Sequence, residues 1–139
     1  MAKENGRRFL LYRIDTANVA IPLGTTASIS ITNGVIDTTD KDSGGWRELL
    51  DGLREWTASM TANYDQEQAE QLGLIDKIID TTTTTQTEIG VGFDDNTGDI
   101  LFKGNALVSE TTLNGDNNAV VTVDYAFEGT GALTKVIKA

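Results

Sequence analysis

The feature that most constrains the fold is an alternation of apolar and polar residues that is nearly strict in one segment and recurs in three others. From Trp56 to Tyr64 every second residue is apolar, and the residues between them include Thr57, Ser59 and Thr61. The same period of two runs through 27–32, 85–93 and 119–127. Successive side chains of a β-strand point to opposite faces, so this pattern predicts half-buried strands. Further strands are expected at 7–14, 100–109 and 133–138.

Polar segments that contain glycine predict where these strands turn. Asn33-Gly34 precedes Val35–Thr39 and predicts a tight hairpin, because both residues tolerate positive φ. Asp94–Gly98 and Asn114–Asn117 predict two more turns. Gly104 is expected to kink one strand, and Gly129–Gly131 to break another.

One segment changes from the strand period to the helical period. Asp65 is a candidate N-cap with Gln68 three residues on, a variant of the capping box. Apolar residues then follow at helical spacing and predict a core-facing stripe of Ala69, Leu72, Ile75 and Ile79, with Leu74 and Ile78 beside them. Asp80 and the five threonines after it should end the helix, since β-branched runs favour extended chain. The predicted fold is mostly β (α+β): a β-sandwich or barrel with one flanking helix, in a single domain over residues 1–139.

Composition excludes several classes of function. The chain has 21 acidic and 11 basic residues, a net charge of −10, and neither cysteine nor histidine. Adhesion to nucleic acid requires clustered Lys and Arg, and the missing residues remove disulfides, thiol nucleophiles and the usual general base. Arg13 and Asp15 interrupt the first apolar stretch, so no signal peptide or membrane span is expected, and the chain is expected in the cytoplasm unless it leaves by a route the sequence does not encode.

Two acidic turns are candidates for metal sites. Segment 40–51 loosely follows the spacing of a calcium loop, but its twelfth position is Asp51, which is shorter than the bidentate Glu that this geometry needs. Segment 94–99 is a second acidic turn, and in both cases a solvated turn is the better interpretation. No catalytic residue, metal site or cofactor is predicted.

Two tryptophans, Trp46 and Trp56, flank a polar, glycine-containing segment that is longer than a hairpin requires. Both could cap the core, or, with Arg47 and Arg54 nearby, they could form a protein–protein contact. The residues alone leave both interpretations open.

Two longer runs carry a family resemblance. Residues 35–59 contain an Asp37-Thr38-Thr39 strand end, a Ser43-Gly44-Gly45-Trp46 loop, and Gly52 four residues before an aromatic-led strand; residues 127–133 read Phe-Glu-Gly-Thr-Gly-Ala-Leu. In this order they resemble the major tail proteins of long-tailed bacteriophages, of the lactococcal-phage type. The resemblance covers nearly the whole chain in length and element order.

That resemblance implies a tail tube protein whose subunits form hexameric rings that stack into a conduit for DNA. It implies a long loop, 39–54, that contacts the neighbouring ring, and terminal segments that do the same. The expected contact residues are Asp40, Asp42, Gly44, Gly45, Trp46, Arg47, Leu49, Leu50 and Arg54. The implied partners are further copies of the chain, a tape measure protein, a tail terminator and distal tail proteins. The implied location is the virion tail after assembly in the host cytoplasm.

The resemblance also implies a DNA-conducting lumen without specific binding, which the acidic charge suits because like-charged walls oppose adhesion. The lumen candidates are Asp37, Thr57, Ser59, Thr61, Asp94, Asp95 and Asp99, and at least two carboxylates among these and Asp40 and Asp42 should lie at the wall. The competing interpretations are a soluble β-sandwich binding or adhesion module, and a tube protein of a contractile tail, a secretion system or a gene transfer agent.

Overall fold

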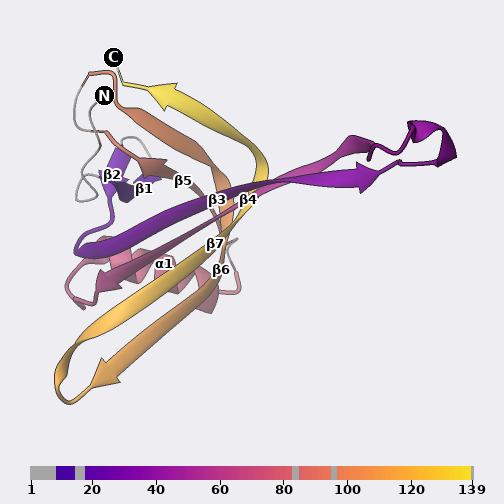
Figure 1. Cartoon of the computed structure of the whole chain (residues 1–139). Helices are drawn as coiled ribbons and strands as arrows, with labels where there is room; N and C mark the ends of the chain where they lie inside the picture. Colours follow the sequence, from indigo (N-terminus) through magenta and orange to yellow (C-terminus); the bar gives the residue numbers. More distant parts are fainter. Residues whose placement is uncertain (1–8, 15–17, 83–84, 95–96, 139) are drawn as a thin grey trace.

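The computed structural model describes residues 9–14, 18–82, 85–94 and 97–138 (Figure 1). Within these residues, seven strands form one antiparallel sheet in the order β2-β1-β5-β6-β7-β4-β3. The strands are β1 (Leu10–Ile14), β2 (Asn18–Ala20), β3 (Gly24–Asp37), β4 (Leu49–Asn63), β5 (Gln86–Gly92), β6 (Ile100–Asp116) and β7 (Ala119–Ile137). One α-helix, α1 (Ala69–Ile79), joins β4 to the β5 side of the sheet. The mostly-β prediction with a single helix is confirmed.

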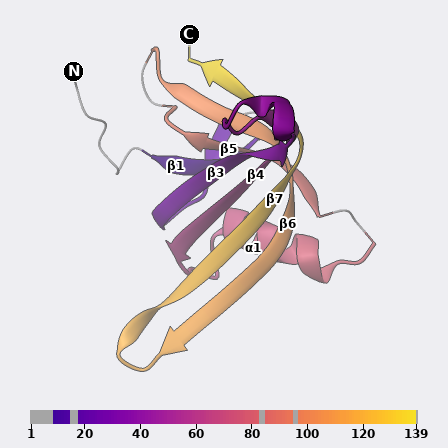
Figure 2. The ribbon, with the colours of Figure 1, turned by 45° about the vertical axis from the view of Figure 1, so that its right-hand side comes forward.

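The sheet curls strongly, and the core lies on its inner side (Figure 2). The alternating residues of β4, β5 and β7 supply this core as the sequence predicts. Among them, Trp56, Met60, Ile89, Val91, Val123, Tyr125 and Phe127 are buried. In the described part of the chain, no helix is long and apolar enough to cross a membrane.

The hairpin predicted at Asn33-Gly34 is wrong. β3 continues through both residues to Asp37, and the chain turns only at 38–48, around a short 3-10 helix at Lys41–Ser43. Gly34 instead lies opposite Gly52 and Leu53 of β4, at a register shift. A Cβ on Gly52 would stand 2.8 Å from the Gly34 carbonyl oxygen, so these glycines permit a close backbone approach at a bulge.

The helix is present, and its core-facing side matches the predicted stripe only in part. Leu74 and Gln71 are its buried residues, Ile75 is half-buried, and Ile79 is 70% exposed. The side-chain amide of Gln71 donates to the backbone carbonyls of Pro22 and Asn63, both at 2.9 Å. The Tyr125 hydroxyl donates to the backbone carbonyl of Gln71 at 3.0 Å. This hydrogen bonding allows an amide to occupy the place expected for an aliphatic side chain.

Both ends of the helix differ in detail from the capping prediction. The N-cap is Gln68 without a side-chain bond, while the Asp65 carboxylate accepts from the Glu67 N–H at 3.0 Å. The helix ends before Asp80 as predicted. The Asp80 carboxylate accepts from the hydroxyl and backbone N–H of Thr82, which lower its pKa.

Glycines bend the long strands without ending them. β6 continues past Gly104 with a register shift there, which is the predicted kink. The break predicted at Gly129–Gly131 is wrong, because β7 continues to Ile137. The slot between Gly129 and Gly104 holds the indole of Trp56, which is 4% exposed. Of the expected first strand, residues 10–14 form β1, and residues 7 and 8 lie outside the described residues.

Candidate assembly surfaces

A two-stranded hairpin at 32–54, here called the arm, projects from the body of the molecule (Figures 1 and 2). It consists of the end of β3, the tip at 38–48 and the start of β4. Its apolar side chains are exposed to solvent, with Trp46 80% and Leu53 89% exposed. The others are Val35, Ile36, Leu49 and Leu50. An isolated two-stranded ribbon cannot bury such residues against itself, so the arm is a surface that another molecule could cover.

Hydrogen bonds fix the tip of the arm although its side chains are exposed. The Glu48 N–H donates to the Thr39 hydroxyl at 2.8 Å, and the Thr38 N–H donates to the Glu48 carbonyl at 3.0 Å. The Thr39 N–H donates to Asp37 at 2.9 Å, and Arg47 lies 3.6 Å from the same carboxylate. The backbone N–H of Thr39 is the main reason that the pKa of Asp37 is lowered, and the Thr39 hydroxyl and Arg47 add to it. The tip is therefore a defined structure.

The structure brings all the predicted contact residues together on this arm. Gly44 and Gly45 both have positive φ, which explains the Gly-Gly sequence before Trp46. Val35, Ile36 and Leu53 also belong to the arm but were not predicted, because the sequence places a hairpin turn at Asn33-Gly34 and begins the next strand at Trp56. Their alternation with polar residues is interrupted by the bulge, so no simple period revealed them. Contact between these residues and another subunit stays a prediction.

A second surface, here called the polar face, covers the outer side of β3, β4, β7 and β6. Directly opposite residues in an antiparallel sheet share a face, so the strand register defines which residues belong to it. Three rows of paired residues cross the face: Ser30, Thr57 and Glu128; Ser28, Ser59 and Ala126; and Thr61, Asp124 and Thr112. Two shallow grooves run over it, lined in part by Ser109 and Glu110. Lysine and arginine are absent from these lining and paired residues.

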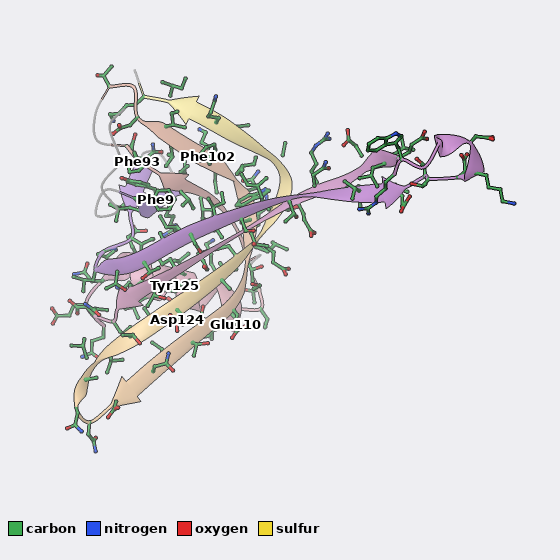
Figure 3. All side chains as sticks on the ribbon, in the orientation of Figure 1. Phe9, Phe93, Phe102, Glu110, Asp124 and Tyr125 are labelled. Atoms are coloured by element: carbon green, nitrogen blue, oxygen red, sulfur yellow. The ribbon has the colours of Figure 1, made fainter. Side chains whose placement is uncertain are left out.

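Hydroxyls and amides hold the acidic groups of the polar face. The Thr61 hydroxyl donates to one oxygen of Asp124 at 2.6 Å, and the Asn114 amide donates to the other at 3.1 Å. The Thr112 hydroxyl donates to Glu110 at 3.2 Å. Figure 3 labels Asp124 and Glu110 on the neighbouring strands β7 and β6. Glu110 is exposed, whereas Asp124 is half-buried and neighbouring side chains bond both of its carboxylate oxygens.

The structure separates the predicted lumen residues into different places. Thr57, Ser59 and Thr61 lie on the polar face, whereas Asp37 lies on the arm. Asp94 lies at the β5–β6 turn, 3.4 Å from the Lys138 ammonium, and its carboxylate accepts from the Asn18 amide at 3.2 Å. Asp99 lies in the same turn, where its carbonyl accepts from the Lys138 N–H at 2.8 Å. Asp95 lies outside the described residues.

The acidic residues beside Thr57, Ser59 and Thr61 are different ones, Glu110, Asp124 and Glu128. They were not predicted because they come from strands far along the chain. The available signal was that each acidic residue lies an even number of residues from a threonine of its own strand, which puts both on the same face. Asp51, the last residue of the loose calcium spacing, contacts Asn33 at 3.1 Å and Arg54 at 3.6 Å. Among the described residues, no three acidic side chains are grouped so as to hold a metal ion.

Two strand edges flank the polar face. In the described chain β3 pairs only with β4, and β6 beyond Val108 pairs only with β7. These edges present backbone N–H and C=O groups that can pair with another strand. The four strands between the two edges alternate in direction.

Comparison with solved structures shows close likeness over nearly the whole chain. A chain of the virion of a native gene transfer agent particle superposes with a TM-score of 0.81 at 22% identity, covering 96% of this chain and 99% of that one. A chain of the tail of the empty gene transfer agent particle, determined with C6 symmetry, gives 0.79 at 22% identity and covers 99% and 100%. The SPP1 tail tube gives 0.70 at 15% identity and covers 94% and 76%. These likenesses confirm the fold.

Sequence likeness points to the same group of proteins. No curated protein sequence matches. Residues 3–135, however, match the model of a family described as phage tail tube protein. The resemblance inferred from the Gly-Gly-Trp loop and the closing Phe-Glu-Gly-Thr-Gly run is thereby confirmed, and the chain belongs to the phage tail tube protein family.

Proposed function

We propose that this protein forms hexameric rings that stack into the tube of a phage-type tail, and that DNA passes through the lumen of that tube. The observation that carries the proposal is the combination of an acidic polar face with free strand edges on both sides. Family membership and the C6 symmetry of a structurally similar tail support the same conclusion.

The free edges suggest how a ring closes. β3 of one copy would pair with β6 of the next. The four strands β3, β4, β7 and β6 alternate in direction, so β3 and β6 run in opposite directions and each pair between copies is antiparallel. Six copies would give a closed barrel of twenty-four strands. Closure leaves no unpaired edge, which is how barrels remove the risk of uncontrolled strand pairing.

The polar face would then line the lumen. Glu110, Asp124 and Glu128 would repeat around the wall together with the serine and threonine hydroxyls. A ring would carry roughly −60 in formal charge, and the wall carboxylates would repel phosphate within about a Debye length, near 8 Å at physiological salt. This wall would hold water and let DNA slide without specific binding.

The arm would contact the neighbouring ring, with Trp46 as its largest anchor. In this proposal the tube surrounds a tape measure protein and ends at a tail terminator and at distal tail proteins. The product is part of the virion tail and is assembled in the host cytoplasm. The structural likeness to a gene transfer agent tail leads us to propose the tube and not one particular machine.

Electron microscopy of the purified chain tests the proposal. We expect rings or tubes, and a species that stays at 15.0 kDa at high concentration would refute it. The two tryptophans provide matched variants. Trp46→Ala should keep the melting temperature and weaken assembly by about 2 kcal/mol or more, whereas Trp56→Ala should cost about 3–5 kcal/mol of folding stability. Full-length tubes from a Trp46→Ala chain at unchanged concentration would show that Trp46 does not anchor the contact between rings.

A further inference from the structure

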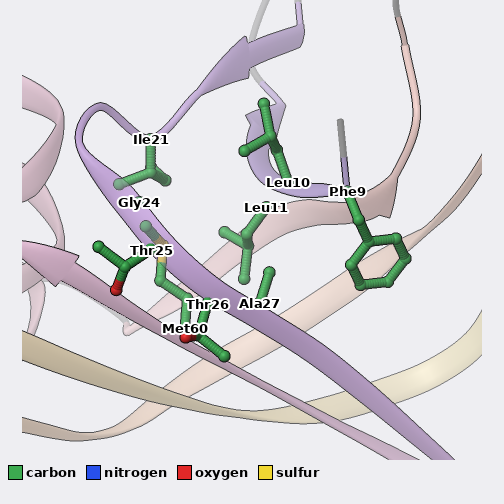
Figure 4. Close-up of a pocket in the computed structure, with 9 residues that line it drawn as sticks. All are labelled: Phe9, Leu10, Leu11, Ile21, Gly24, Thr25, Thr26, Ala27 and Met60. Carbon is green, nitrogen blue, oxygen red and sulfur yellow. The ribbon is translucent and has the colours of Figure 1, made fainter. Parts of the chain in front are cut away.

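The body of the molecule contains an apolar pocket between β1 and the start of β3 (Figure 4). Its walls are Phe9, Leu11, Ile21, Ala27 and Met60, and Thr25 lies at its rim. The cavity volume is about 170 Å³. Leu11, Ile21 and Met60 are buried, and Phe9 is already in edge contact with Phe93 at a centroid distance of 5.5 Å. The pocket is therefore present in the folded subunit and is lined mainly by apolar side chains, with threonines beside them.

Its size suits an aromatic side chain. An apolar protein cavity of about 150 Å³ accepts a benzene molecule. Among the exposed large apolar side chains of the described residues, Trp46 is the one aromatic. Residues 1–8, which precede Phe9, have Met1 as their one large apolar side chain. The chain thus offers one well-matched occupant.

Trp46 cannot fill the pocket of its own molecule. The pocket uses residues at the start of β3, and the arm lies at the other end of the same strand (Figure 1). With a rise of about 3.3 Å per residue, the stretch from Thr26 to Asp37 alone spans about 36 Å. The contact must therefore join two copies.

We infer that Trp46 of one subunit inserts into the Phe9–Met60 pocket of a subunit in the next ring. Arm and pocket lie at opposite ends of β3, so the contact is head-to-tail and repeats without closing on itself, as a stacked tube requires. The inference rests on the proposed function, and it names the receiving surface for the arm.

Cysteine cross-linking tests the inference, since the natural chain has no cysteine. The pair Arg47→Cys and Thr25→Cys keeps Trp46 in place and puts one thiol beside it and the other at the pocket rim. Both positions are exposed, and the exposed Arg47–Asp37 pair contributes little to folding. Mild oxidation of assembled tubes should give a ladder of covalent oligomers. Trp46→Ala in the same background should reduce the linked fraction at least tenfold.

The matched control is Arg47→Cys with Val120→Cys, which places the second thiol on the exposed β6–β7 hairpin. This pair should give no ladder. Tubes that form without the 47–25 link, or that link 47 to 120 instead, would overturn the inference and leave the proposed function standing. If the 47–25 link appears only after residues 2–8 are removed, the pocket belongs to the chain's own N-terminal segment and the inference is wrong. Failure of the unmodified chain to form tubes would refute the proposed function itself.

Discussion

Replacing Gly129 by alanine should destabilise the protein more than any other single methyl group added to a strand. The indole of Trp56 lies directly on the backbone of Gly129, so an added Cβ would overlap the ring. The ring also lies against Gly104, where an added Cβ would lie 2.9 Å from Cζ2. With alanine at position 129, the indole cannot keep this position. It has to leave its buried position.

The magnitude follows from what the displaced ring loses. Overpacking alone costs about 1–3 kcal/mol, and loss of a buried tryptophan costs about 3–5 kcal/mol. Because Trp56 is 4% exposed, we expect Gly129→Ala to approach the second range. For a chain of 139 residues this lowers the melting temperature by roughly 10 °C, at about 3 °C per kcal/mol. Calorimetry and urea unfolding measure both quantities.

Gly115→Ala is the matched control, because the nearest atom to its added Cβ is Val121 Cγ2 at 3.9 Å, an ordinary contact. It should leave the melting temperature within about 2 °C of the natural chain. Trp56→Leu in the Gly129→Ala background should cost less than the two single changes combined, since both act on one slot. A Gly129→Ala protein that melts like the natural chain would show that Trp56 does not depend on this slot.

Three further predictions concern the helix, the arm tip and the polar face. Ile75→Asp should cost about 2–3 kcal/mol of folding stability, because Ile75 packs against the core. Ile79→Asp should cost almost none, because Ile79 is exposed. Equal melting temperatures of the two variants would contradict the orientation of the helix. The carboxyl of Asp37 should titrate below its ordinary pKa, so the tip hydrogen bonds are present at neutral pH and are lost as the pH falls through that lowered value. Thr39→Val removes the hydroxyl and keeps the backbone N–H, so it should raise this pKa only part of the way in an NMR titration. An unchanged titration would count against the contribution of the hydroxyl. Replacing Glu110, Asp124 and Glu128 of the polar face by lysine should still permit tubes to form. These tubes should retain DNA at low salt and release it at high salt, because lysine binds phosphate. Particles with these substitutions that eject DNA unhindered would argue against an acidic lumen.

The sequence predicted the strands whose two faces differ, because burial of one face imposes a period of two. It failed at Asn33-Gly34, where a strong local turn signal is overridden by pairing between two long strands that need glycines at their closest approach. It also missed Gln71 on the core-facing side of the helix and wrongly included Ile79, because a buried Gln71 satisfied by two carbonyls looks polar in sequence. The arm could be located from its Gly-Gly-Trp loop. The acidic residues of the polar face could not, because their proximity depends on pairing between β4, β7 and β6.

The bulge at Gly52 and Leu53 changes the side of the ribbon to which β4 presents its apolar residues. In the body, Trp56 faces the core, and uninterrupted alternation from there would put Leu50 on the core side as well. The extra residue instead sets Leu50 opposite Ile36, on the side of the outward hydroxyls, and brings Asp51 next to Asn33 on the core side. The apolar core therefore does not simply lengthen along β4 into the arm. A single irregularity in the ladder therefore decides which side of the projecting ribbon Leu50 faces, and so from which side a neighbour could cover it.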